Sequence, residues 1–246
     1  MNRRLYAIHK WVSAIAFLQL SIWTITGFLF TVISQESLKS APVEGAHHGV
    51  VTGAVVPISR VLELAAAAGE VERVELRGTA AGVYYVVKGA TATVRLDART
   101  GEAAPVSREE AEAAASRDQQ GSPAVRATTL VTEGGLEYRD CGYVSCGLPA
   151  YRVALADAAG TVVYVDATTG DVTARRNDRW RTYDFLWSLH IMDYRGREDF
   201  NHLLIRGAAL LALGTVLSGI VLLVLRLSGW VRRRRSRGEA GASAAA

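Results

Sequence analysis

The chain has 246 residues, of which 50% are hydrophobic and 21% are charged, and its formal net charge is +4. This length would suit one or two ordinary domains, but the apolar residues are concentrated in two uncharged runs, 11–33 and 207–225. A bilayer core about 30 Å thick needs about 20 helical residues, so each run is long enough to cross a membrane. This distribution excludes an ordinary soluble globular protein and indicates a membrane protein.

The basic residues lie outside the two runs. Cations before the first run and after the second predict that both termini are cytoplasmic, by the positive-inside rule. The chain is then expected in a plasma (inner) membrane, with residues 35–202 on its periplasmic or extracellular side. Residues 232–235 could contact nucleic acid, but beside a span they are better interpreted as a topology anchor at anionic lipid. The tail cations are Arg3, Arg4, Lys10, Arg226, Arg232, Arg233, Arg234, Arg235 and Arg237.

Residues 1–34 are predicted to hold a cytoplasmic N-terminus and the first transmembrane helix. A cleaved signal peptide is the alternative, with Arg3 and Arg4 as its basic end. Its apolar region would usually have about 7–15 residues, and 11–33 is longer. The following segment, 35–41, has no good small-x-small cleavage site. An uncleaved anchor is the favoured interpretation.

Residues 35–55 have the composition of a linker, and its His47-His48 pair is interpreted as solvated rather than metal-binding. Residues 56–105 then predict a helix at 57–68 followed by strands at 71–76, 83–87 and 93–96. The helix follows from apolar residues at helical spacing, with Gly69 as its stop. A turn at Asp97-Ala-Arg-Thr-Gly101 ends this first unit.

Residues 106–178 repeat the pattern. Ser107 and Glu110 have the spacing of a capping box, and strands are predicted at 124–131, 150–155 and 161–165. A second turn, Asp166-Ala-Thr-Thr-Gly170, lies 69 residues after the first. Asp and Gly at these positions favour structural turns over calcium loops, which need more oxygen ligands. The expected fold is membrane α+β: two transmembrane helices flanking two repeats of a helix packed on antiparallel strands.

Both cysteines lie in this outer region, at Cys141 and Cys146. An oxidising compartment favours a disulfide between them, and a reactive redox pair is the alternative. Two thiols alone are too few for a structural zinc site.

The end of the chain is again membrane-associated. Residues 179–202 are rich in aromatic residues and predict an interfacial segment, 203–228 the second transmembrane helix, and 229–246 a basic cytoplasmic tail. Small residues on the second span, such as Gly214 and Gly219, would allow close helix packing.

Several stretches resemble known families. The segments 148–153 and 163–170 are similar to the PepSY domain. The segments 187–194 and 200–205, and Leu5-Tyr-Ala-Ile-His-Lys-Trp11 followed by Thr26-Gly27, resemble the PepSY-associated transmembrane family. Larger members of that family have four spans and this chain has two, so a four-helix core would require a homodimer or a partner membrane protein.

The resemblance also implies a cofactor, since some such proteins hold haem through histidines. His9, His190 and His202 occupy the matching positions, and imidazole is a common haem ligand. A 23-residue helix extends about 34 Å, so His9 cannot share an iron with the other two. His190 and His202 could share one haem b, and a second would need two His9 side chains from a dimer. The alternative is that each of the three lies near an interface, where an imidazole simply faces lipid headgroups or caps a helix.

No catalytic constellation is visible, because the sequence has no Gly-x-Ser-x-Gly, His-Glu-x-x-His or phosphate-loop motif. Two functions remain open. The first is a haem-carrying electron-transfer component, related to reduction of ferric iron or siderophores. The second is a non-enzymatic, membrane-anchored PepSY accessory that binds or inhibits a peptidase. A transporter fits poorly, since the spans carry few interior polar groups beyond Gln19.

Overall fold

The computed structural model describes residues 3–34, 38, 49–133, 147–197 and 199–244. The chain divides into two compact units. One comprises Met1–Val32 with Phe185–Ala246, and the other comprises Ile33–Asp184. The disulfide expected between Cys141 and Cys146, and the His47-His48 pair, lie outside the described residues.

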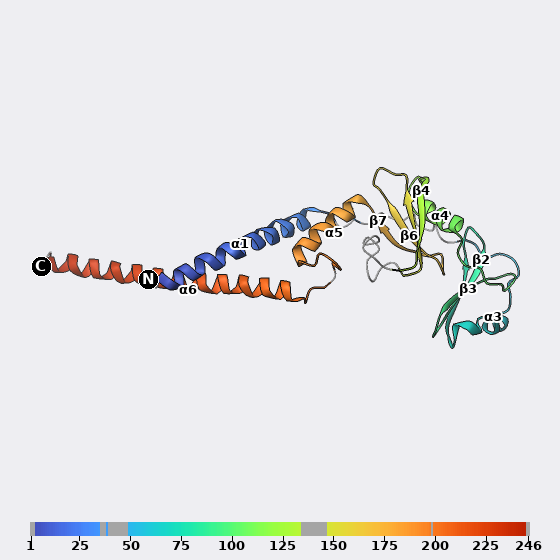
Figure 1. Ribbon diagram of the computed structural model, residues 1–246, viewed down its shortest axis with the longest axis horizontal. Helices are drawn as coiled ribbons and strands as arrows, with labels where there is room; N and C mark the ends of the chain where they lie inside the picture. The colour runs from blue at the N-terminus through green and yellow to red at the C-terminus, as the bar shows by residue number, and fades with distance from the viewer. Residues whose placement is uncertain (1–2, 35–37, 39–48, 134–146, 198, 245–246) are drawn as a thin grey trace. The chain divides into compact units, whose positions relative to one another are not determined.

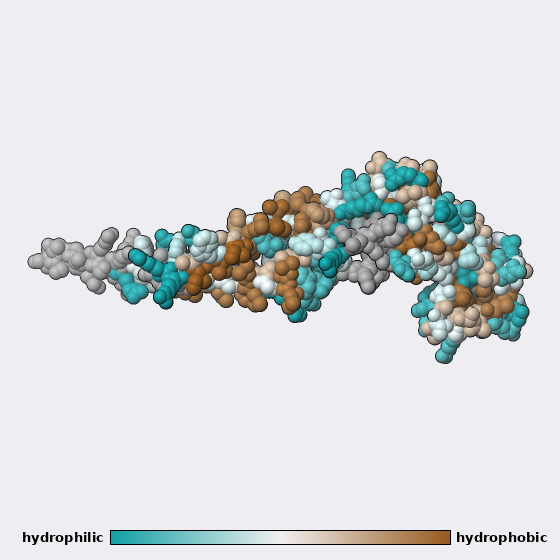
Figure 2. All heavy atoms as spheres, viewed as in Figure 1, coloured by the Kyte–Doolittle hydropathy of each residue, from teal (hydrophilic) through white to brown (hydrophobic). Residues whose placement is uncertain are grey.

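Two long helices, α1 (Arg3–Val32) and α6 (Leu203–Ala244), pack side by side in the first unit (Figure 1). Their segments Tyr6–Val32 and Leu203–Arg232 are long and apolar enough to cross a membrane, with mean hydropathy of 1.8 and 2.6. Figure 2 shows apolar side chains over much of the visible surface in the middle of these segments, with hydrophilic residues toward their ends. Because most of these side chains do not pack inside the chain, an apolar surrounding such as lipid has to cover them.

Both helices extend beyond the uncharged runs of the sequence. A charged residue ends a run of apolar residues but not a helix, because Arg and Lys are good helix formers. Helix α5 (Asp178–Ile191) lies where the interfacial segment was expected, and its residues from Phe185 onward belong to this unit.

The second unit begins with a short helix on a three-stranded sheet. Helix α3 (Ile58–Leu64) and the 3₁₀ turn η1 (Ala66–Ala68) precede the strands β1 (Val71–Gly78), β2 (Val83–Gly89) and β3 (Thr93–Asp97). The strands are antiparallel in the order β1-β2-β3. The α-helix predicted to reach residue 68 stops after Leu64, and the chain then tightens into η1 before Gly69, whose φ is 78°. The core is formed by Val61, Ala65, Val83, Tyr85, Val87, Leu96 and Ala98.

A second helix and a four-stranded sheet follow. They are α4 (Arg108–Arg117) and the strands β4 (Val125–Val131), β5 (Ala150–Leu155), β6 (Val162–Asp166) and β7 (Val172–Arg176). The antiparallel order is β4-β5-β6-β7. Helix α4 packs its alanines on one face of the sheet, in a core of Val106, Ala111, Ala115, Val153, Leu155, Val163 and Val165. Tyr164 is fully buried in a cluster with Ala150, Ala154, Val162 and Ala174.

The two aspartate turns have the same geometry. Asp97 Oδ1 accepts hydrogen bonds from the backbone N–H groups of Arg99 and Thr100, at 2.8 and 3.0 Å. Asp166 Oδ1 accepts the equivalent pair at 2.7 and 2.8 Å. Gly101 and Gly170 close the turns with φ of 78° and 82°, which favours glycine. These motifs therefore end β3 and β6 as structural turns.

Candidate functional site

The imidazole of His190 is held by a hydroxyl group of the first span. His190 lies in the last turn of α5, and its Nδ1 atom is 2.7 Å from Oγ1 of Thr26 on α1. The Thr26 side chain is buried, and its hydroxyl donates to the carbonyl of Ile22 at 2.7 Å. With the single proton of the hydroxyl assigned to that carbonyl, the hydroxyl accepts a hydrogen bond from His190, and the imidazole proton is assigned to Nδ1. The tautomer inferred in this way leaves a lone pair on Nε2.

Aromatic residues fix the position of this imidazole. The ring of Phe30 contacts it edge-on with centroids 5.4 Å apart, and Trp187 lies parallel to it at 6.3 Å. Trp23 donates its indole N–H to the carbonyl of His190 at 2.7 Å. A Cβ at Gly27 would lie 3.9 Å from the imidazole, so the ring sits directly against the backbone of α1. The ring is therefore oriented from both α1 and α5.

His9 repeats this arrangement at the other end of α1. Its Nδ1 atom lies 2.7 Å from Oγ of Ser218 on α6, and Ser218 donates to the carbonyl of Thr215 at 3.0 Å. The imidazole proton is again assigned to Nδ1. Ser13 Oγ lies 3.4 Å from Nε2, which is a long contact. A Cβ at Gly219 would lie 3.3 Å from the ring.

Each of these two histidines thus contacts a dipeptide made of a hydroxyl residue and a glycine. Thr26-Gly27 receives His190 and Ser218-Gly219 receives His9. Each hydroxyl accepts a hydrogen bond from the Nδ1–H group, and at Gly219 an added Cβ would lie only 3.3 Å from the ring. Seventeen residues of α1 separate His9 from Thr26, about 25 Å at 1.5 Å per residue. The two imidazoles therefore belong to separate sites at opposite ends of the span.

His202 has a different environment. Its Nε2 atom lies 3.0 Å from the carbonyl oxygen of Ile191, and its Nδ1 atom accepts the backbone N–H of Ile205 at 3.3 Å. The second bond is that of an N-cap, because Ile205 lies in the first turn of α6. Both ring nitrogens bond to backbone groups, so coordination of iron by either nitrogen of His202 would break at least one of these bonds.

The sequence reasoning identified the three histidines but missed the hydroxyls that orient two of them. Thr26 and Ser218 are small polar residues within apolar runs, where such residues are common. The available signal was that each precedes a glycine. Within the described part of the chain, no group of three or more His, Cys, Asp or Glu side chains could hold a metal ion.

The fold and these sites define a membrane protein in which two apolar helices flank a region of antiparallel sheets. A family model described as the PepSY-associated TM region matches residues 6–243. The chain belongs to this family, as its sequence motifs predicted. Comparison with curated proteins and with solved structures gives no match.

Proposed function

We propose that this protein is a haem-binding electron-transfer component of the plasma (inner) membrane, in which the imidazoles of His190 and His9 would each hold a haem. The observation that carries the proposal is the hydrogen bond from His190 Nδ1 to Thr26. Metal-ligating histidines characteristically bond their second ring nitrogen to an oriented acceptor, which fixes the tautomer and raises ligand basicity. A surface histidine facing headgroups would not need a buried threonine.

The donor set fits haem b in part. His190 offers a neutral Nε2 in an aromatic surrounding, and His9 offers the same atom at the other end of α1. Bound haem would supply one-electron transfer. The residues around His190 would hold its ring in place, and the buried Thr26 would keep the proton on Nδ1. A second copy of this chain or a partner membrane protein would provide a further iron ligand at each site.

The orientation belongs to the same proposal. The cations at both ends favour cytoplasmic termini, which assigns His9 to the inner side and His190 to the outer side. Electrons would then pass outward to an acceptor such as ferric iron or a ferric siderophore. The reductant has to come from another protein, since the sequence carries no recognisable flavin or nicotinamide motif.

The test is the visible spectrum of the full chain, purified in mild detergent from haem-replete cells. We expect a Soret band that sharpens on reduction, and we expect His190→Ala and His9→Ala each to remove part of it. A colourless protein, or a Soret band unchanged in both variants, would refute the proposal. In that case the PepSY accessory role, with the spans as anchors, would be the function to pursue.

A further inference from the structure

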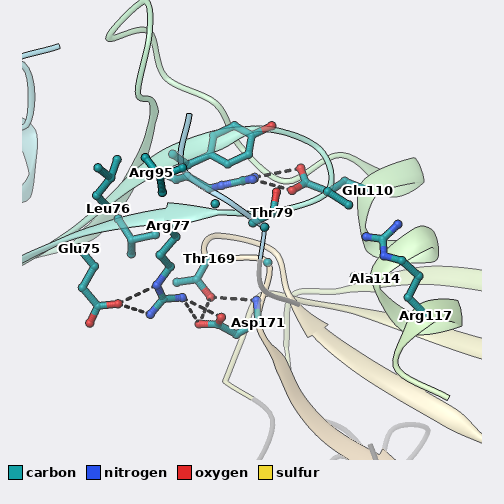
Figure 3. Close-up of a pocket in the computed structure, with 17 residues that line it drawn as sticks. Glu75, Leu76, Arg77, Thr79, Arg95, Glu110, Ala114, Arg117, Thr169 and Asp171 are labelled. Carbon is teal, nitrogen blue, oxygen red and sulfur yellow. Dashed lines mark hydrogen bonds and ion pairs between the residues drawn. The ribbon is translucent and has the colours of Figure 1, made fainter. Parts of the chain in front are cut away.

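A pocket of about 480 Å³ lies in the unit Ile33–Asp184, between its two sheets (Figure 3). Its floor is one face of the three-stranded sheet. Strand register places Glu75, Val86 and Arg95 on that face, whereas Tyr85, Val87 and Leu96 point to the opposite face and pack with α3. Helix α4 and the turn between β6 and β7 supply the walls.

Two ion pairs join the floor to the walls. Arg95 forms a two-pronged pair with Glu110 of α4, at 2.5 and 3.0 Å, and its guanidinium stacks over Tyr84 at 3.5 Å. The Arg95 side chain is 1% exposed. Arg77 pairs with both Asp171, at 2.7 Å, and Glu75. The carboxylates of the pocket are thus occupied by its own arginines.

Arg117, in the last turn of α4, also lines the pocket and has no such partner. Its Nε atom is buried without a hydrogen bond, and its guanidinium forms no ion pair with another described residue. Glu75 is shared with Arg73 as well as Arg77. The lining holds three guanidinium groups, of Arg77, Arg95 and Arg117, and three carboxylates. Because Arg77 engages two of these carboxylates and Arg95 the third, Arg117 is the lining cation without a carboxylate partner among the described residues. A buried N–H donor without a partner is unfavourable, so an acceptor from outside the chain would stabilise it.

The charge balance limits the kind of acceptor. A guanidinium binds carboxylate and phosphate well, but a phosphate dianion would bring two charges to one free cation beside Glu75, Glu110 and Asp171. A single carboxylate brings one negative charge, which matches the one lining guanidinium group, that of Arg117, without a carboxylate partner among the described residues. The remaining lining includes the apolar residues Val51, Ala80, Val86 and Ala114.

We propose that this pocket binds a monocarboxylate with an apolar body, whose carboxylate pairs with the guanidinium of Arg117. The carboxylate belongs to a free aliphatic acid or to the C-terminus of a peptide, which share this chemistry. The proposal concerns only the central unit and does not depend on haem.

Binding of hexanoate and of N-acetyl-alanyl-leucine to the full chain in detergent tests the proposal, with saturation-transfer NMR as the readout. Hexanamide and the C-terminal amide of the peptide are the neutral controls. At least one acid should bind, and its amide should bind about tenfold more weakly or not at all, because charge-assisted hydrogen bonds are the stronger ones. Arg117→Gln should weaken binding of the acid by about tenfold or more. Arg108→Gln, on an exposed position of the same helix, should leave it unchanged.

The pattern of binding separates the two sources. Hexanoate binding alone indicates a free aliphatic acid, and peptide binding alone indicates a C-terminus. If neither acid binds, if acid and amide bind equally, or if Arg117→Gln binds the acid as the unaltered chain does, the proposal is wrong. Circular dichroism of both variants would establish that they are folded.

Discussion

The Nδ1 atom of His190 and the Oγ1 atom of Thr26 lie 2.7 Å apart, although 164 residues separate them in the chain. Replacing Thr26 by valine keeps the shape of the side chain and removes the acceptor. The imidazole would then have a part-buried N–H without a partner and no fixed tautomer. We expect haem affinity to fall by about 10- to 100-fold, the usual effect of losing such a supporting partner. The haem-to-protein ratio on titration with hemin measures it.

Thr24 provides the matched control for this variant. It lies on the same helix, is exposed, and bonds only the carbonyl of Leu20, at 2.8 Å. Thr24→Val should bind haem as the unaltered chain does. Equal affinities in Thr26→Val and Thr24→Val would show that the buried hydroxyl does not orient a ligand.

His202→Asn distinguishes an N-cap from a haem ligand. Asparagine is among the best N-cap residues and can accept the N–H of Ile205, but it cannot replace an imidazole on iron. We expect His202→Asn to retain both its haem spectrum and its thermal stability. Loss of the Soret band in a folded His202→Asn protein would instead make His202 an axial ligand.

Gly219 determines how closely α6 approaches His9. A Cβ at this position would lie 3.3 Å from the imidazole, so Gly219→Val overpacks the interface between the two spans. Overpacking typically costs about 1–3 kcal/mol. Gly214→Val is the control, because a Cβ there meets no atom within 4 Å. Unfolding in mixed micelles with increasing SDS should be easier for Gly219→Val alone, and equal sensitivity would contradict the packing described.

Removing one partner of the buried ion pair between Arg95 and Glu110 is expected to destabilise the fold more than removing both. Their side chains are 1% and 14% exposed, so Glu110→Ala leaves a buried guanidinium uncompensated, at a cost of about 3–5 kcal/mol. Replacing both residues with apolar ones, Arg95→Met with Glu110→Leu, should recover most of the loss. Glu63→Ala breaks the exposed pair with Arg60 and should cost about 0–1 kcal/mol. Urea unfolding of the full chain, followed by circular dichroism, measures all three.

Asp97 should contribute to acid sensitivity. Backbone N–H groups of Thr100 and Arg99 donate to its carboxylate and hold its pKa below the ordinary value of 3.8. A lowered pKa in the folded state stabilises the fold above pH 3.8, and this contribution is lost as the pH falls through the folded-state pKa. Asp97→Asn should therefore be less stable at neutral pH and lose less stability on acidification. Unfolding curves across this range should converge at low pH, and curves that stay parallel would contradict the prediction.

Local patterns predicted most of the elements of the central unit. Helical and strand-like patterns predicted α3 and six of the seven strands in the described residues, and the capping-box spacing of Ser107 and Glu110 predicted α4, because each signal depends on residues close in sequence. Strand β7 was missed. Its sequence, Val-Thr-Ala-Arg-Arg, is mostly polar, and of its side chains only Ala174 is buried. Pairing with β6, rather than its own composition, makes this segment a strand.

The sequence could not predict contacts between residues that are far apart in the chain. Ser107 does cap α4, since its Oγ accepts the N–H of Glu110 at 3.1 Å. The second bond of a capping box would run from the backbone N–H of Ser107 to the Glu110 carboxylate. That carboxylate instead pairs with Arg95 of the three-stranded sheet. Helix capping was one alternative predicted for the three histidines, and His202 does cap α6. The sequence could not single out His202, since both of its bonds depend on where α5 ends and α6 begins.

The two sheets of the central unit keep separate apolar cores, and the ion pairs of Arg95 and Arg77 bridge them. These two connections differ in their access to water, since Glu110 is 14% exposed and Asp171 is 52% exposed. Dissolved salt screens exposed charges far more than buried ones. A rise in ionic strength would therefore weaken the ion pair of Arg77 with Asp171 while the pair of Arg95 with Glu110 persists. The salt concentration of the surrounding solution would thus set how strongly the two sheets are held together.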